Sequence, residues 1–132
     1  MKIRTFAFGG LLAVALASVG GTAFGATVMP FTQQSFADAQ KAGKPILVDV
    51  WASWCPTCKA QAPTLSAIEA DPANKDLLVL KVDFDAQKDV VRSFGVRMQS
   101  TLIAFHGGTE KARSTGVTNA DAIKALVAKA SQ

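Results

Sequence analysis

Both cysteines of the chain lie in one short segment, WASWCPTCKA, which holds the residue types best suited to redox chemistry. Cys55 and Cys58 are separated only by Pro56 and Thr57. Two thiols at this spacing can form a redox couple, supply half of a metal site or close a structural disulfide. A disulfide stabilises a fold mainly by closing a long loop, and this pair closes almost none. A purely structural role is therefore disfavoured.

The residues on either side of Cys55 predict a sharp strand-to-helix junction. The preceding run PILVDVWA is almost continuously apolar and rich in β-formers, which indicates a strand buried on both faces. From Pro56 onward the pattern is helical, and proline suits a first helical turn. A sulfur at a helix N-terminus is stabilised as thiolate by backbone N–H groups and the helix dipole.

The dipeptide between the cysteines limits that stabilisation. Pro56 has no N–H to donate and Thr57 carries no charge, so we expect the Cys55 thiolate to be moderately stabilised. Cys58 follows one turn later on the same side of the helix, where we expect it to lie deeper. The first sulfur would then attack a partner, and the second would displace it.

A single carboxylic acid, Asp49, interrupts the apolar strand six residues before Cys55. Burial disfavours the charged form of a carboxyl group and so raises its pKa. A buried acid with a raised pKa beside a reaction site is a candidate proton carrier. The structural alternative is an aspartate held by ordinary hydrogen bonds at a strand edge.

The N-terminal residues have the pattern of a secretory signal peptide. Lys2 and Arg4 precede a run without charge over residues 5–19, and small residues follow. The run is shorter than the roughly 20 residues that span a bilayer. We therefore predict a signal peptide over residues 1–25, cleaved between Ala23 and Ala26, and a mature domain over residues 26–132. The alternative is an uncleaved membrane anchor.

The predicted export favours a disulfide over a metal site, and the charge of the mature part argues against nucleic-acid binding. In an oxidising compartment such as the periplasm, a cysteine pair is more often a disulfide than a metal site. The formal net charge is +4, and Lys2 and Arg4 leave with the signal peptide. No cluster of basic residues remains in the mature part, so we predict no nucleic-acid binding. We also predict no membrane span after cleavage.

The order of turn signals and hydrophobic periodicity predicts an α/β fold, a mixed sheet with helices on both faces. Two pairs with capping-box spacing, Ser35 with Asp38 and Thr118 with Asp121, are expected to open the first and last helices. Pro63 is expected to kink the helix that follows Cys55. The predicted strands fall near residues 28–31, 45–52, 76–85, 100–105 and 110–115, and the helices near 35–43, 56–70, 86–95 and 118–130.

Taken together, these segments resemble the thioredoxin family. VDVWASWCPTCKAQAP is similar to the active-site segment of that family, and LKVDFD, FGVR, TLIAFHGG and STGV follow at its spacing. No gap is needed between Lys81 and Gly116, and the resemblance covers about residues 31–130. It implies the thioredoxin fold, a central mixed β-sheet flanked by helices on both faces.

The resemblance also implies roles for individual residues. Cys55 matches the attacking thiol and Cys58 the resolving thiol of a redox-active disulfide. Asp49 matches the buried acid that helps Cys58 to ionise, and Lys81 matches a strand lysine that tunes the charge of that acid. A solvated strand-end lysine is the alternative for Lys81. These four residues are the predicted catalytic set.

A second set is predicted to bind substrate. Trp54 matches the aromatic residue that borders the site, and Gly116 matches the loop that helps to form the substrate groove. Trp51 is expected only to pack in the core. The predicted substrate-binding residues are Trp54, Pro56, Thr57, Ser100, Thr101 and Gly116.

The chain departs from the family at two places. Pro-Thr stands between the cysteines where thioredoxins usually have Gly-Pro, which resembles glutaredoxin-like and disulfide-forming members more closely. Ser100 stands where the family has a cis-proline. A cis bond before a non-proline residue costs about 2.5 to 4 kcal/mol, against about 0.5 to 1 kcal/mol before proline. We therefore predict a trans Gln99–Ser100 bond and a remodelled loop.

Three consequences of Ser100 are expected. Backbone recognition of substrate becomes looser, the Ser100 hydroxyl can hydrogen-bond the Cys55 sulfur, and the site is more open to capture of a metal or cluster by the two thiols.

We predict an exported, monomeric thiol-disulfide oxidoreductase without a cofactor that exchanges its Cys55–Cys58 couple with protein substrates. Asp49 and Lys81 favour a reductant, because they serve the step in which Cys58 becomes a nucleophile. A reductant in the periplasm needs a membrane electron-donor protein. The alternatives are a disulfide oxidase or isomerase, a redox-inert scaffold, or a module that binds a soft metal or an iron–sulfur cluster. Two cysteines cannot close a four-ligand site, so that module requires a second chain or an extra ligand.

Overall fold

A computed structural model describes residues 24–132, so the predicted signal peptide lies almost wholly outside the described residues. The core of the described part is one five-stranded sheet in the order β1-β3-β2-β4-β5. The strands β1, β3 and β2 are parallel, and β4 and β5 are antiparallel to their neighbours. Their bounds are β1 Thr27–Pro30, β2 Pro45–Trp51, β3 Leu78–Asp83, β4 Thr101–His106 and β5 Thr109–Thr115.

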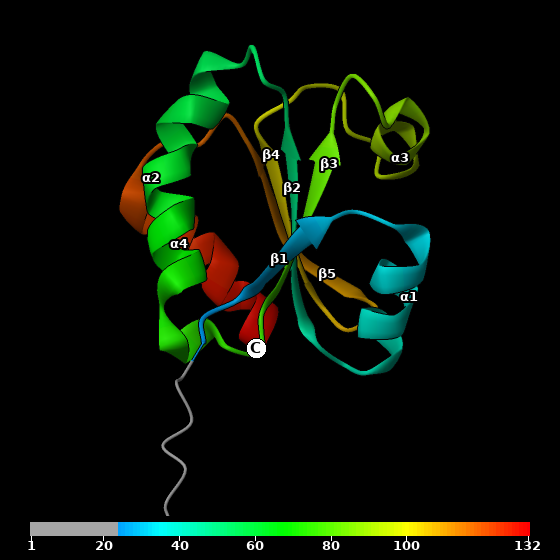
Figure 1. Ribbon diagram of the computed structural model, residues 1–132, viewed down its shortest axis with the longest axis vertical. Helices are drawn as coiled ribbons and strands as arrows, with labels where there is room; N and C mark the ends of the chain where they lie inside the picture. The colour runs from blue at the N-terminus through cyan, green and yellow to red at the C-terminus, as the bar shows by residue number, and fades with distance from the viewer. Residues whose placement is uncertain (1–23) are drawn as a thin grey trace, which may run out of the picture.

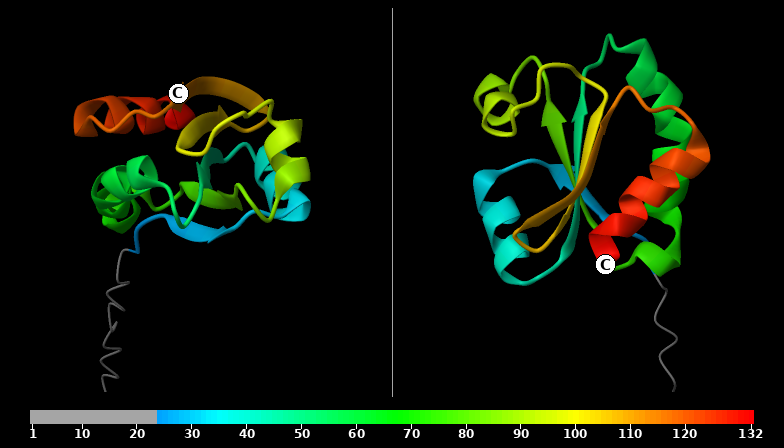
Figure 2. Two further views of the ribbon diagram at one scale, coloured as in Figure 1. Left: turned by 90° about the horizontal axis from the view of Figure 1, so that it is seen from above. Right: turned by 180° about the vertical axis from the view of Figure 1, so that it is seen from behind.

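Helices cover both faces of this sheet, as predicted (Figures 1 and 2). The helices α1 (Gln33–Lys41) and α3 (Lys88–Ser93) lie on one face, and α2 (Pro56–Ala70) and α4 (Ala120–Ala128) lie on the other. Short 3-10 helices follow α2 at Pro72–Asn74 and α4 at Lys129–Ser131. No helix within residues 24–132 is both long enough and apolar enough to cross a membrane.

The period of two along each strand decides which side chains face which helices. In β2, Ile46 and Val48 belong to the core beneath α1 and α3, whereas Leu47 belongs to the core beneath α2 and α4. Asp49 therefore faces α2, the helix that carries the cysteines. In β3 the same alternation places Lys81 on the α2 face, directly beside Asp49 in the strand register.

The structure corrects the predicted caps of two helices. The N-cap of α1 is Thr32, whose hydroxyl accepts the N–H of Ser35 at 3.0 Å. The N-cap of α4 is Asn119, whose side-chain oxygen accepts the N–H of Ala122 at 2.9 Å. In both cases a residue with a better-placed oxygen lies next to the start of the helix, so the capping-box spacing at Ser35 and Thr118 was misleading.

The helix α2 continues through Pro63 without interruption. Proline cannot donate the backbone hydrogen bond that would close this turn, which is the reason for expecting a kink. The kink itself stays a prediction.

Candidate active site

The two cysteines form a disulfide at the N-terminus of α2, with Cα atoms 5.3 Å apart. The strand β2 ends at Trp51, a short turn follows, and Cys55 is the N-cap of the helix. Pro56 occupies the first helical turn, as predicted. The backbone N–H of Cys58 donates to Cys55 Sγ at 3.0 Å. The sulfur of Cys55 thus accepts a hydrogen bond from a backbone N–H group of the first helical turn, as the sequence predicted.

The burial of the two cysteines is the reverse of the prediction. In the disulfide form Cys55 has no exposed surface, whereas Cys58 is half-buried and lines a cavity. The physical reason is the capping geometry: the Cys55 sulfur turns back over the first turn of the helix to accept the Cys58 N–H. Cys58 lies on the flank of α2 that faces the cavity. The expectation that Cys58 lies deeper is therefore wrong for this form.

Asp49 and Lys81 form an ion pair between neighbouring strands. The distance from Lys81 Nζ to Asp49 Oδ2 is 3.0 Å, and the side chain of Asp49 is 2% exposed against 37% for Lys81. Asp49 Oδ1 has no hydrogen-bond partner among the described residues. Because β2 is the central strand of the sheet, the alternative of an aspartate at a strand edge is wrong.

Burial raises the pKa of Asp49 above its ordinary value of 3.8, and the charge and hydrogen bond of Lys81 only partly oppose this rise. A carboxyl group in this state releases and accepts a proton closer to neutral pH than an exposed aspartate does. Lys81 is not a free strand-end lysine, since its ammonium group is held at the carboxylate.

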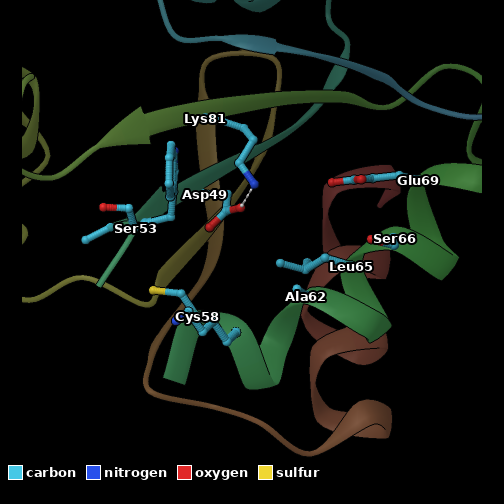
Figure 3. Close-up of a pocket in the computed structure, with 11 residues that line it drawn as sticks. Asp49, Ser53, Cys58, Ala62, Leu65, Ser66, Glu69 and Lys81 are labelled. Atoms are coloured by element: carbon cyan, nitrogen blue, oxygen red, sulfur yellow. Dashed lines mark ion pairs between the residues drawn. The ribbon is translucent and has the colours of Figure 1, made fainter. Parts of the chain in front are cut away.

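A cavity of about 210 Å³ connects the ion pair with the disulfide. Figure 3 shows Asp49 with Lys81 on one side of the cavity and Cys58, at the start of α2, on the other. Glu69 lies on the same wall as Cys58, further along α2. Burial raises the pKa of Glu69, Lys81 lowers it and Asp49 raises it further. The cavity thus joins one sulfur, two carboxyl groups and one ammonium group.

Trp51 also lines this cavity and is half-buried, which differs from the expected role in the core alone. Lys81 Nζ lies 5.5 Å from the centre of the Trp51 ring, within the range of a cation–π contact. The ring therefore forms one wall beside the ion pair.

Exposed side chains border the disulfide on the outer surface. Trp54 is 54% exposed, and its indole N–H donates to Asp85 Oδ2 at 2.6 Å. Pro56 is exposed and Thr57 is half-buried. Met98, just before the Ser100 loop, is 56% exposed. These side chains give the predicted substrate-binding face an apolar character.

The peptide bond before Ser100 is trans, as predicted, and Ser100 has a positive φ of 58°. Ser100 is buried, and its hydroxyl donates to the carbonyl of Gln99 at 2.5 Å. The expected hydrogen bond from this hydroxyl to the Cys55 sulfur is therefore not made in the disulfide form. The carbonyl of Ser100 accepts the N–H of Gly116 at 3.0 Å, which ties the two predicted substrate loops together.

Thr101 acts inside the loop rather than at its surface. Its side chain is buried, donates to the carbonyl of Met98 at 2.8 Å, and lies 2.9 Å from the hydroxyl of Thr115. Gly116 has a positive φ of 78°, a conformation that suits glycine. Of the predicted substrate-binding residues, Thr101 is placed to shape the loop and not to present its side chain.

Sequence reasoning missed four residues of this region, namely Trp51, Gln61, Glu69 and Asp85. A signal existed for Gln61, because it precedes the buried Leu65 by four residues and Ile68 by seven, the spacing of one helix face. Gln61 is fully buried. The pairing of Asp85 with Trp54 joins residues 31 positions apart and has no signal in the sequence.

No group of three or more His, Cys, Asp or Glu side chains within residues 24–132 is arranged to hold a metal ion. A metal or cluster held by Cys55 and Cys58 would still need a second chain or an extra ligand, as expected from the sequence.

Comparison with known proteins extends these observations. The family model for thioredoxin matches residues 27–129. The thioredoxin of Chlamydia muridarum (strain MoPn / Nigg) is 38% identical over 98 residues, which cover 74% of this chain and 93% of that protein. The bifunctional thioredoxin reductase/thioredoxin of Mycobacterium leprae (strain TN) is 39% identical over 92 residues, which cover 70% of this chain but only 20% of that protein.

A solved structure, that of Trxlp from Edwardsiella tarda EIB202, superposes with a TM-score of 0.74 at 44% sequence identity. The match covers 76% of this chain and 98% of that one. The order of strands and helices described above is therefore shared with a protein of related sequence.

Proposed function

The chain belongs to the thioredoxin family, and from that premise we propose that it is an exported disulfide reductant of the periplasm that acts on protein substrates. Family membership and the Cys-x-x-Cys disulfide establish thiol-disulfide oxidoreductase activity. The observation that carries the proposed direction is the cavity in which Cys58 faces the buried Asp49–Lys81 pair. This arrangement serves the step that a reductant needs most, the ionisation of the second cysteine.

The first step is attack by the Cys55 thiolate on one sulfur of a partner disulfide. A bond forms between Cys55 Sγ and that sulfur, the partner's own disulfide bond breaks, and the second partner sulfur leaves as a thiolate. The N–H of Cys58 donates to Cys55 Sγ at 3.0 Å in the disulfide form, and the same donor is placed to stabilise the thiolate.

The second step closes the disulfide. Cys58 loses its proton and attacks Cys55 Sγ, the Cys55–Cys58 bond forms, and the remaining partner sulfur leaves as a thiolate and is protonated. The partner gains the two electrons that the two cysteines lose. Asp49 accepts the proton from Cys58, because burial gives it a raised pKa and the cavity places it opposite that residue.

Cys55 has to become reachable for this sequence of steps, since it is fully buried in the disulfide form. We propose that opening of the disulfide frees its sulfur toward the exposed face of Trp54. The assignment can be tested by treating the reduced protein with a limiting amount of iodoacetamide and locating the label by mass spectrometry. Faster labelling of Cys55 supports its role as the attacking thiol. Faster labelling of Cys58 would make Cys58 the attacking thiol and Cys55 the resolving thiol.

Export is supported by the pattern of residues 1–25 alone, with its basic start, uncharged run and small-residue end. A reductant in an oxidising compartment needs a supply of electrons, so the proposal includes a membrane protein that passes electrons to the disulfide. Expression of the full chain in a double-membraned bacterium tests export. A periplasmic product that begins between Ala23 and Ala26 is expected, and a full-length cytoplasmic product would contradict the proposal.

The direction of transfer is tested by the equilibrium reduction potential of the Cys55–Cys58 couple, titrated against glutathione and dithiothreitol. A value near about −270 mV is that of a reductant, and a value near about −120 mV is that of a disulfide donor. The second result would replace the reductant by a disulfide oxidase. The variant Cys55→Ser is the control, since it must abolish exchange in either direction.

A further inference from the structure

Gln61 is a fully buried polar side chain on α2, the helix that begins at the active-site disulfide. It shares a helix face with the core residues Leu65 and Ile68. A carboxamide at such a position is retained at a cost unless its groups are hydrogen-bonded. Its Nε2 is hydrogen-bonded and its Oε1 has no hydrogen-bond partner among the described residues, so the contacts of Nε2 show what this side chain does.

The amide group of Gln61 joins two loops that lie far apart in the sequence. Nε2 donates to the carbonyl of Ser100 at 3.2 Å and to the carbonyl of Val117 at 2.8 Å. Ser100 directly precedes β4, and Val117 follows β5. The N–H of Gly116 donates to the same Ser100 carbonyl at 3.0 Å. One side chain from the cysteine-bearing helix thus holds both loops of the predicted substrate groove.

The backbone at Ser100 needs such a restraint. Its φ of 58° is uncommon for a residue other than glycine, and conformations of this kind persist only where the surroundings hold them. Among the described residues, the Ser100 hydroxyl bonds only to the preceding carbonyl, so it does not tie the loop to them. The two hydrogen bonds to the Ser100 carbonyl, from Gln61 and Gly116, do so.

We propose that Gln61 is a positioning residue that sets the binding of protein substrates, by holding the Ser100 and Gly116–Val117 loops at a fixed place beside the disulfide. The inference rests on the proposed function, because it specifies how that site binds a protein partner. Within residues 24–132, the hydrogen bonds of Gln61 go to the two loops and not to either sulfur. Its loss therefore alters the groove beside the disulfide and not the chemistry of the couple.

This role separates two classes of substrate. A protein disulfide has to lie along the groove between the two loops, whereas a small aromatic disulfide such as DTNB has only to reach a sulfur. Loosening the loops weakens binding of the first class and leaves reaction with the second nearly unchanged.

The test replaces Gln61 by methionine, which keeps the length of the side chain and removes both donors. Expressed from the full sequence, Q61M is compared with wild type for the reduction of insulin and of DTNB. We expect the KM for insulin to rise roughly three- to thirtyfold, the loss typical of one or two hydrogen bonds. The kcat for insulin and the rate with DTNB should change less than twofold. Q61L repeats the test with a different apolar shape, in case methionine packs poorly.

A matched control is Asn74→Leu, in the 3-10 helix that follows α2. Asn74 Nδ2 donates to the carbonyl of Ile68 at 2.9 Å, so N74L also removes a carboxamide that donates to a backbone carbonyl. Its KM values should equal those of wild type. Equal changes with insulin and DTNB in the Gln61 variants, or an unchanged KM for insulin, would overturn the proposal.

A second readout does not depend on turnover. The amide hydrogen of Gly116, bonded to the Ser100 carbonyl, should exchange with solvent at least threefold faster in Q61M and at an unchanged rate in N74L. If wild type fails to reduce insulin but oxidises a reduced unfolded protein, the reductant direction is wrong, and the KM comparison is run with that substrate. Slow, unaltered exchange at Gly116 in Q61M overturns the positioning role whichever direction holds.

Discussion

The replacement Asp49→Asn removes the buried charge from the centre of the site while keeping the size of the side chain. Asp49 is almost fully buried, and one of its oxygens has no hydrogen-bond partner among the described residues. Burial raises the pKa of Asp49, and Lys81 offsets this only in part. The folded protein therefore holds the proton on this carboxyl group up to a higher pH than the unfolded chain does, and the free energy of unfolding depends on pH in a predictable way.

The sign follows from which state holds the proton. Between 3.8, the ordinary pKa of the carboxyl group, and its raised pKa in the fold, the native state keeps the proton that the unfolded state has lost. The free energy of unfolding of wild type thus falls as pH rises through this window, by at most about 1.4 kcal/mol per pH unit. The stabilising contribution is complete below 3.8 and lost above the raised pKa.

Asp49→Asn has no such titration, so its free energy of unfolding minus that of wild type should rise across the window and then become constant. The total rise equals about 1.4 kcal/mol for each unit by which the fold raises this pKa. The assay is urea unfolding of the disulfide form between about pH 3.5 and pH 8.5. Glu69 titrates in both proteins, and Asp49 is the smallest of the three causes that shift its pKa, so most of its contribution cancels in the difference.

Lys81→Met provides an internal check. Because Lys81 lowers the pKa of Asp49 in the fold, its removal should extend the upper end of the window to higher pH and leave the lower end and the slope unchanged. A difference between wild type and Asp49→Asn that does not vary with pH would refute the reasoning, as would a difference that falls as pH rises.

Three further replacements test separate parts of the structure. Ser100→Gly relieves a left-handed residue that costs about 1 to 2 kcal/mol, against about 0.5 to 1 kcal/mol for the entropy of glycine; urea unfolding should show equal or higher stability, and a clear loss would contradict the strain argument. Asp85→Ala removes the acceptor of the Trp54 indole N–H, and the indole hydrogen should then exchange faster with solvent, as measured by NMR. The free energy of unfolding should fall by no more than about 1 kcal/mol. An unchanged exchange rate would show that this hydrogen bond contributes nothing. Gly107→Ala places a Cβ 3.2 Å from Gly43 Cα at a residue with a φ of 53°, and it should lower the free energy of unfolding by about 1 to 3 kcal/mol, measured by thermal unfolding. Gly108→Ala is its control, because a Cβ at that position has no neighbour within 4 Å. Equal melting temperatures for the two variants would contradict the predicted clash.

The order of the elements and the chemistry of the couple could be predicted from the sequence. Apolar periodicity distinguishes the strands from the helices, because a buried strand and an amphipathic helix repeat with different periods. The same pattern indicates that Asp49 is buried, since it interrupts an apolar strand. The spacing of Cys55 and Cys58 before a helical segment indicates a thiol pair at a helix N-terminus. All these signals lie within a few residues of one another.

The remaining features depend on where separate segments meet in space. The reversed burial of Cys55 and Cys58 follows from how the capping sulfur turns over α2 and from the cavity beside it. The placing of Asn119 as the cap of α4 depends on which neighbouring oxygen reaches the helix, and several residues had the required type.

By itself, the sequence determined that this chain is an α/β protein with a reactive thiol pair beside a buried acid, because local periodicity and spacing encode those properties. Only the tertiary structure decided which sulfur faces the cavity and which groups share that cavity with it. It also decided that Gln61 donates hydrogen bonds to the carbonyls of Ser100 and Val117, 39 and 56 residues away in the chain. Contacts over such separations arise from the packing of the sheet against α2, and no local pattern of residues specifies them.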